Sequence, residues 1–494
     1  MIDNLIIGAG TAGITISSNL KKGKTLVLEK SKFYGYPFFF KVPLFIGLIF
    51  NSKYIKLISF KKNDRLIPFY ESGVVGGASE INGCVHAFGT KDKWDMALEG
   101  VNLDYEDIYK SYNNIFSYNP KGKQIALRKA HTNQIDELFF SYLDSLDFKH
   151  GDMSFSDSQI YGPISINVKT FFRSSVKQLI DNSQKKRIKK DVEVYDIKFD
   201  VNNNVLGVNT SNGFIAAKNV ILSAGAIGTN KILLNTKRKL QKSKCVDPIS
   251  NKVGHNVQDH PNFRIKVFTH KKFETLNEIN NSILLKAKNF IRHFIGKNTF
   301  FSATGASSAA YFDFNNDGIV DTKIQIVQFT EKGRLSSDKS KMQFDEEPGF
   351  SLAITIIDPK STGSISLDQA GKINIEPNYF QNSEDIKVAH KAIEFVMKFL
   401  NSKMIKDEIK NIENYDLLKS NVIKFINENH YSGYHLIGGC SLKNNGVIGR
   451  NLNVKGVNGL YVCDASCFDN HVSSNTHAPV VSLANSFVEK LYEF

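Results

Sequence analysis

Hydrophobic residues at the start of the chain form short continuous runs separated by a segment with helical spacing. Residues 4–7 are an apolar run that predicts a buried strand. Residues 15–20 are typical of a helix, and residues 25–28 form a second apolar run. This strand–helix–strand order within thirty residues predicts a βαβ unit of a parallel sheet.

The middle and the tail of the chain return to strand patterns. Residues 187–225 alternate apolar runs with turns, which predicts a β-meander ending in a buried strand at 219–223, and residues 230–234 look helical. Residues 459–466 (GLYVCDAS) predict a buried strand that ends in an acid, and residues 479–491 a closing helix. These segments have the same pattern as the first unit, with short apolar strands next to turns and helices.

Residues 263–400 differ from both flanks. They hold long alternating segments such as KIQIVQF and FSLAITIID, which favour extended antiparallel strands. Apolar residues at helical spacing predict a helix over 383–402. The chain is also too long for one simple core, so we expect more than one structural unit.

We therefore predict an α/β fold (α+β overall). A Rossmann-like nucleotide-binding domain is built from discontinuous segments, and a mainly antiparallel β-sheet substrate domain with helices is inserted. The predicted boundaries are 1–100, 185–262 and 431–494 for the three parts of the nucleotide-binding domain, 101–184 for a substrate or cap segment, and 263–430 for the substrate-binding domain.

The glycine pattern directly after the first strand indicates what this domain binds. Gly8 allows a tight bend, Gly10 lets a pyrophosphate approach the backbone, and Gly13 lets helix and strand pack closely. Glu29 ends the second strand, near the spacing expected for a carboxylate that binds a ribose diol. The whole unit predicts a dinucleotide site, whereas the glycines alone would fit an ordinary αβ turn.

Charge and composition exclude several classes of function. The 494 residues carry a net charge of +14, but the lysines are scattered and no nucleic-acid-binding motif accompanies them, so we expect no nucleic acid partner. The five cysteines form no CxxC pair, which suits a reducing compartment. The start shows no signal-peptide pattern, and we expect a cytoplasmic protein.

Two apolar segments leave a peripheral membrane contact open as an alternative. Residues 36–50 (YPFFFKVPLFIGLIF) are too short and broken to span a bilayer, and we favour a buried loop or lid over a membrane-facing flap. Residues 284–297 predict a basic amphipathic helix, whose apolar side we expect to face a core.

Metal and nicotinamide chemistry are not indicated. Residues 313–318 are acidic but lack the alternating ligands and closing glutamate of a calcium loop, so we predict a turn and no metal site. A second GxGxxG is absent from the sequence, which argues against an NAD(P)H-driven reductase.

Several motifs, in order, resemble those of the glucose-methanol-choline (GMC) flavin oxidoreductases. They are the glycine pattern with Glu29, residues 76–83 (GGASEING), residues 223–227 (SAGAI) with Leu233 and Leu234, residues 253–261 (VGHNVQDHP), residues 434–440 (YHLIGGC), and residues 464–466 (DAS) followed by Asn475. Residues 71–73 and 438–440 depart from the family pattern, so the resemblance carries no substrate specificity.

The resemblance implies FAD as cofactor. Some members attach FAD covalently through a histidine in the GG loop, where this chain has Ile81, so we expect noncovalent FAD. Val192 is expected near adenine, and Asn82 and Gly83 near the isoalloxazine ring. The predicted cofactor-binding residues are Gly8, Gly10, Thr11, Ala12, Gly13, Glu29, Lys30, Gly76, Gly77, Ser79, Asn82, Gly83, Val85, Val192, Ala224, Gly225, Asp464, Ala465, Asn475 and Thr476.

The resemblance also implies the catalytic pair, His435 and Asn475. His435 is predicted to take the hydroxyl proton of an alcohol, such as a sugar or polyol, while flavin N5 accepts the hydride. Asn475 would orient the substrate oxygen, His477 is the less favoured second group, and His260 is expected to be structural or on the cofactor side. The electron acceptor is oxygen, a quinone or another carrier. The alternatives are a non-redox or light-driven GMC-type lyase or decarboxylase, and a flavin-binding protein without turnover.

Overall fold

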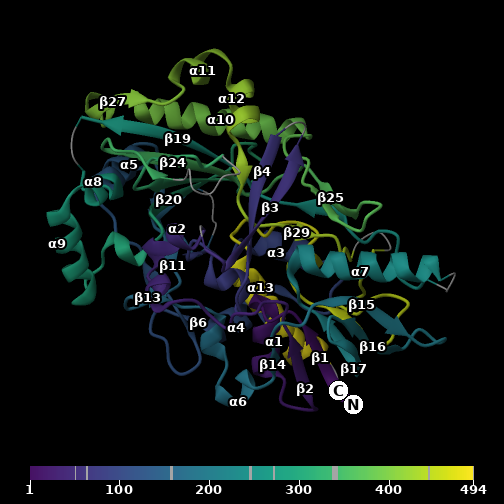
Figure 1. Ribbon diagram of the computed structural model, residues 1–494. Coiled ribbons are helices and arrows are strands. Elements are labelled where there is room, and N and C mark those ends of the chain that lie inside the picture. Colours follow the sequence, from purple (N-terminus) through teal and green to yellow (C-terminus); the bar gives the residue numbers. More distant parts are fainter. Residues whose placement is uncertain are drawn as a thin grey trace.

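Two large sheets, at opposite ends of the molecule, organise the chain (Figure 1). The structure is a computed structural model, and it describes residues 1–50, 52–62, 65–155, 159–243, 247–270, 273–335, 343–442 and 446–492. Both chain termini lie beside the first sheet (Figure 1).

The first sheet is the predicted nucleotide-binding sheet. Its parallel strands run in the order β14 (Ile188–Lys189), β2 (Thr25–Leu28), β1 (Ile2–Ile7), β17 (Gly213–Leu222) and β30 (Leu460–Val462). β17 also pairs with β16 (Val205–Thr210), and β16 with β15 (Val194–Phe199), which gives the predicted antiparallel meander. The strands therefore come from separate parts of the chain, as predicted.

Helices from both ends of the chain cover this sheet. α1 (Thr11–Asn19) packs against α13 (His477–Ser486), which also packs against α4 (Tyr105–Ile115). α13 is nearly all buried because its residues are apolar or small on every side. α1 begins four residues before the predicted start, since small residues open its first turn and the apolar spacing appears only later.

The second sheet is mainly antiparallel. Its order is β27 (Ile409–Ile412), β19 (Pro261–Thr269), β24 (Gly349–Ile356), β21 (Thr322–Val327), β20 (Ala306–Phe312), β10 (Ile160–Pro163) and β9 (Lys149–His150), with only the last of these pairs parallel. The predicted helix is α10 (Ser383–Leu400), which packs against β24 through apolar side chains such as Ile393 and Val396. The opposite face of the sheet points toward the first sheet.

Further elements lie around the sheets. They include the hairpin of β3 (Ile55–Lys62) and β4 (Arg65–Ser72) and the long helix α7 (Gly225–Lys242) that follows β17. Helix α5 (Gln134–Asp144) contacts β10, and α12 (Val422–Asn429) contacts α10 and β19. Cys84, Cys440, Cys463 and Cys467 are buried free thiols, whereas Cys245 lies outside the described residues. No helix in the described ranges has the length and apolarity to cross a bilayer.

The two apolar segments are more exposed than the sequence analysis expected. Residues 284–297 do form a helix, α9 (Ile283–Phe294), but its buried residues are Asn289 and His293 while Ile283 and Leu284 face solvent. The prediction that its apolar side faces a core is wrong, because the helix packs through its polar edge. In η1 (Phe38–Lys41) Phe40 is buried, but Phe38 and Phe39 are exposed, so the buried-loop prediction holds only in part.

Buried histidines predict that acid destabilises the fold. His86, His260 and His471 are at most 2% exposed. Burial lowers the pKa of His86 to about 3 and the pKa values of His260 and His471 well below normal. The unfolded chain binds protons below about pH 6.5 while these folded rings do not, so the free energy of unfolding falls as pH decreases from there. For His86 we expect a loss of about 2 kcal/mol at pH 5, and His260 and His471 contribute in the same direction.

Thermal unfolding between pH 7.5 and pH 5 measures this effect. The melting temperature should fall by roughly 5 °C or more, and His86→Phe should make the fall shallower. His390→Phe, which changes a half-exposed histidine on α10, should leave it unchanged. A melting temperature that is constant or rises toward pH 5 would contradict the prediction.

Candidate functional site

A large cavity lies between the two sheets. Its volume is about 1610 Å³, more than the roughly 300–1,000 Å³ of an ordinary small-molecule pocket. Its walls include the β1–α1 turn, the β17–α7 turn, residues 433–436 and residues 475–477. The space suits a dinucleotide together with a second small molecule.

The glycine turn at one end of the cavity has the shape that a pyrophosphate needs. A Cβ on Gly13 would lie 1.9 Å from the carbonyl oxygen of Gly8, and one on Gly8 would lie 2.6 Å from that of Ser223. Helix α1 starts at Thr11 without a side-chain cap or an acid in its first turn. Its N-terminal N–H groups and the positive end of its dipole are therefore suited to hold phosphate.

Glu29 is held beside this turn by backbone donors. Its Oε2 accepts a hydrogen bond from Ala9 N at 2.8 Å, and its Oε1 accepts one from Ser31 N at 2.8 Å. The backbone N of Val192 donates to Glu29 O, so Val192 sits against the same wall. Both line the cavity, as does Lys30, which pairs with Glu71 at 3.1 Å. Each carboxylate oxygen of Glu29 keeps a lone pair for a ribose hydroxyl.

The second glycine loop packs directly on the first. Gly76 N donates to Ala9 O at 2.8 Å, and a Cβ on Gly77 would lie 2.8 Å from Gly10 Cα. Gly77 has a φ of 57°, and Gly76 has a φ of 101°, values that favour glycine. The two loops therefore form one continuous floor.

Most of the predicted cofactor residues line the cavity. They are Gly8, Gly10, Thr11, Ala12, Glu29, Lys30, Gly77, Asn82, Gly83, Val85, Val192, Ala224, Gly225, Asp464, Ala465, Asn475 and Thr476. Gly13, Gly76 and Ser79 lie behind the wall, where Gly13 packs under Gly8 and the Ser79 hydroxyl donates to Gly76 O. These three shape the floor rather than face the cavity.

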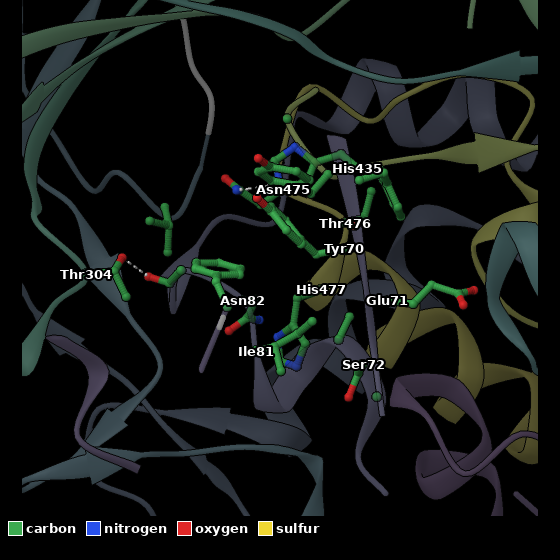
Figure 2. A pocket seen from close by; sticks show the side chains of 18 of the residues that line it. Tyr70, Glu71, Ser72, Ile81, Asn82, Thr304, His435, Asn475, Thr476 and His477 are labelled. Carbon is green, nitrogen blue, oxygen red and sulfur yellow. Dashed lines mark hydrogen bonds between the residues drawn. The ribbon is translucent and has the colours of Figure 1, made fainter. Parts of the chain in front are cut away.

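His435 and Asn475 meet on the opposite wall (Figure 2). The Nδ2 of Asn475 lies 2.9 Å from Nε2 of His435. The backbone N of His435 donates to Asp259 Oδ1 at 2.8 Å, and the hydroxyls of Ser432 and Tyr379 donate to the other oxygen of that carboxylate. The buried Asp259 thus fixes the loop that carries His435.

His260 extends this polar chain. Its Nδ1 lies 3.0 Å from Nδ1 of His435, and its ring is completely buried. Sequence reasoning expected a structural or cofactor-side residue. The structure instead brings it into direct contact with the predicted base, and its position next to Asp259 in the QDHP segment is the only signal that pointed toward this site.

Lys323 is the site residue that sequence reasoning missed. It lies on β21, is 4% exposed, and its Nζ donates to Asn475 Oδ1 at 3.0 Å. Burial lowers its pKa to about 8. No described carboxylate forms an ion pair with it. In the sequence it is one polar position in the alternating run KIQIVQF, which predicts only a strand.

His477 also faces the cavity, next to the turn that carries Asn475 (Figure 2). Neither ring nitrogen has a hydrogen-bond partner among the described residues. Burial, followed by the charge of Arg173, lowers its pKa to about 4. The ring is therefore neutral at pH 7.

The packing of Gly13 gives a test of the cofactor site. Gly13→Ala should abolish or strongly reduce FAD retained on purification, because the added methyl group would force Gly8 and the phosphate turn apart. Flavin absorbance per protein measures the effect. Gly47→Ala, whose added Cβ meets nothing within 4 Å, is the matched control and should keep normal flavin content. Equal flavin content in both variants would contradict the assigned turn.

Comparisons with known proteins agree along the whole chain. A family model described as "GMC oxidoreductase" matches residues 359–484. The chain is 22% identical to a glucose dehydrogenase [FAD, quinone] of Drosophila pseudoobscura pseudoobscura, over 98% of this chain and 85% of that one. It is 23% identical to an oxygen-dependent choline dehydrogenase of Staphylococcus aureus, over 98% and 92%.

Solved structures show the same fold. A formate oxidase superposes with a TM-score of 0.85 at 18% identity, covering 99% of this chain and 97% of that chain. A pyridoxine 4-oxidase from Mesorbium loti gives 0.82 at 16% identity, covering 99% of each chain. The family model covers the tail motifs at 434–440 and 464–466 and Asn475. The matches to the two dehydrogenases extend over 98% of the chain. The chain therefore belongs to the GMC oxidoreductase family and is an FAD-dependent oxidoreductase.

Proposed function

We propose that the protein oxidises an alcohol, such as a sugar or polyol, to a carbonyl compound, with His435 as the base and Asn475 as the group that orients the substrate oxygen. FAD, when bound, supplies the hydride acceptor at N5. The protein must then hold the carbinol carbon, exclude water and take the hydroxyl proton. The observation that carries the proposal is the hydrogen-bond chain through His435.

The protonation state of His435 follows from its neighbours. The ammonium group of Lys323 can only donate, so it pairs with Oδ1 of Asn475 and turns Nδ2 toward His435. The amide then donates to Nε2, which must carry a lone pair, while Nδ1 carries the proton and donates to Nδ1 of His260. Burial, and then the charge of Lys323, lower the pKa of His435 to about 3, so this neutral form dominates at pH 7.

This arrangement directs the basic nitrogen toward the cavity. A substrate hydroxyl that takes the place of the Asn475 amide at Nε2 would give its proton to His435, while the displaced amide N–H donates to the developing alkoxide. The C–H bond then breaks with its electron pair leaving as hydride, and the carbonyl double bond forms from the oxygen electrons. Proton and hydride thus leave in separate directions.

FAD is proposed to be bound without a covalent link. Ile81, which lines the cavity where some relatives carry a histidine, has no nucleophilic atom. The acceptor that reoxidises the enzyme is proposed to be oxygen, a quinone or another carrier, since relatives are named for both oxygen and quinone. Anaerobic reduction followed by addition of either acceptor would separate these possibilities.

Replacement of His435 tests the proposal. In stopped-flow experiments under anaerobic conditions, His435→Ala should slow substrate-driven bleaching of the flavin near 450 nm by about a hundredfold or more, the usual scale of general-base catalysis. Asn475→Ala should slow it by a similar or smaller factor because the alkoxide loses its donor. Flavin content and melting temperature establish that each variant is loaded and folded.

His390→Ala is the matched control and should reduce at the wild-type rate, since His390 lies on the solvent side of α10. Near-normal reduction in His435→Ala would refute the assigned base. The wild-type enzyme is tested against a panel of alcohols, sugars and polyols. If none of them bleaches its flavin, the alternatives are favoured: a lyase or decarboxylase, or a flavin-binding protein without turnover.

A further inference from the structure

The face of the second sheet that covers the cavity carries ordered rows of polar side chains. Strand register places Asn262, Thr355 and Lys323 side by side on three adjacent strands. The next row contains Arg264 on β19 and Gln325 on β21. All five line the cavity, and the first row adjoins His435 through Lys323 and Asn475.

Positive charge is in excess on this face. Arg264 and Arg334 share one carboxylate, Glu331, with an Arg264 Nη1–Glu331 Oε2 distance of 2.6 Å. Within the described residues, Lys323 donates one hydrogen bond, and its acceptor is the neutral Asn475 amide. A buried cation without a counter-ion is costly, and an anion bound beside it would offset that cost.

Unpaired polar atoms on the same face point to a hydroxylated ligand. Nε2 of Gln325 and Oδ1 of Asn262 are buried and have no hydrogen-bond partner in the described structure. One donates and the other accepts, so a ligand hydroxyl or carboxylate oxygen could satisfy each. Both residues line the cavity, so an occupant with a matching hydroxyl or carboxylate oxygen would pair these two atoms.

We propose that the substrate is a hydroxy acid, with its carboxylate held by Lys323, its reacting hydroxyl at His435 and Asn475, and further hydroxyls toward Asn262 and Gln325. This inference rests on the proposed alcohol oxidation and adds the substrate class. Because Lys323 contacts Asn475 directly, the carboxylate lies close to the reacting carbon, and Arg264 in the adjacent row adds positive charge to the same face.

Matched acids and amides test the substrate class. Lactate, glycerate and gluconate are compared with lactamide, glyceramide and gluconamide in anaerobic flavin reduction. At least one acid should show an apparent Kd tenfold or more below its amide, and Lys323→Gln should remove that preference. Lys266→Gln is the control, because Lys266 lies on the same face of β19, pairs with Glu413 and does not line the cavity.

The pH dependence of carboxylate binding separates a charge role from a structural one. The acids should raise the melting temperature of the wild type, and this shift should shrink as pH rises through about 8, where Lys323 loses its charge. His435, His260 and, opposite on β20, Tyr311 face Lys323. Both histidines are already neutral there, and Lys323→Gln should show no such dependence.

The possible failures are distinguishable. If neutral alcohols or amides reduce the flavin as well as the acids do, the hydroxy-acid inference is overturned and alcohol oxidation stands. If no alcohol reduces the flavin but carboxylates still bind through Lys323, the proposed reaction fails and the anion site stands. Absence of both carboxylate binding and acid preference overturns the inference.

A different region of the surface carries a second inference. An apolar patch is formed by Phe38, Phe39, Leu48, Ile283, Leu284, Phe290, Ile291, Phe294 and Ile295, all exposed by 42% or more. The neighbouring residues Phe171 and Phe172 link the two segments of the patch. The ring centroids of Phe38 and Phe172 are 4.7 Å apart, and those of Phe294 and Phe171 are 5.5 Å apart. Helix α9 stands at the edge of the molecule (Figure 1).

Cations surround this patch. Residues 36–50 and 283–297 contain Lys41, Lys286, Lys288, Arg292 and Lys297 but no aspartate or glutamate. Lys288 pairs with Glu274, outside these segments. A second copy of the chain seated symmetrically on the patch would bring these like charges together. An anionic lipid surface matches both the apolar residues and the cations.

The geometry points to docking of this patch on an anionic bilayer surface, with α9 lying in the interface. Leu48, Ile283 and Phe290 also line the cavity, so the cavity opens within the docked face. The helix is too short to span a bilayer, and the contact is therefore peripheral.

Vesicle co-sedimentation tests this docking with the full-length flavoprotein. The protein should sediment with phosphatidylcholine vesicles that contain about one third phosphatidylglycerol and much less with pure phosphatidylcholine or at high salt. Ile283→Asp/Leu284→Asp should reduce binding at least tenfold. Val201→Asp, which changes an apolar residue that is 98% exposed away from the patch, should not.

Equal sedimentation of the double variant and the wild type would overturn the docking proposal, as would wild-type protein that stays in the supernatant with both vesicle types. Size-exclusion chromatography provides a further check. A wild-type dimer that Ile283→Asp/Leu284→Asp converts to a monomer would show that a second copy, rather than lipid, covers the patch.

Discussion

Pairing of β30 with β17 is the contact on which the site depends. It lays residues 460–462 in parallel beside the strand that leads into the α7 turn, at the same sheet edge as the glycine turn after β1. Asp464 then accepts hydrogen bonds from Gly225 N at 2.8 Å and from the Thr229 hydroxyl, which fastens the tail to that turn. Parallel strands place their carboxyl ends together, so one short pairing unites motifs from opposite ends of the sequence.

The second sheet contributes the electrostatics that the nucleotide domain lacks. Its cavity face supplies Lys323, which orients the Asn475 amide and through it the tautomer of His435. His260, directly before β19, completes the chain on the other side of the ring. The two domains therefore make different contributions to the site. The nucleotide domain forms the cavity floor from backbone, and the domain of the second sheet sets charge and proton positions with buried side chains.

Much of this structure follows from local sequence pattern. Apolar periodicity predicted β1, β2, the meander and α10, and the glycine spacing predicted the turn after β1. Lys323 could not be found this way, because its neighbours Thr355 and Asn262 reach it only through strand register. The amphipathic pattern of α9 predicted a helix correctly, but amphipathicity defines a face and not its partner, so the direction of that face was predicted wrongly.

The burial of α13 between α1 and α4 has a consequence for biosynthesis. The N-terminal βαβ unit leaves the ribosome first, yet the apolar surface of α1 is covered by residues 477–486. Until the last part of the chain emerges, that surface has no native partner. Folding of the nucleotide domain must therefore wait until residues 477–486 have left the ribosome, and loss of these residues would remove a central layer of the N-terminal domain.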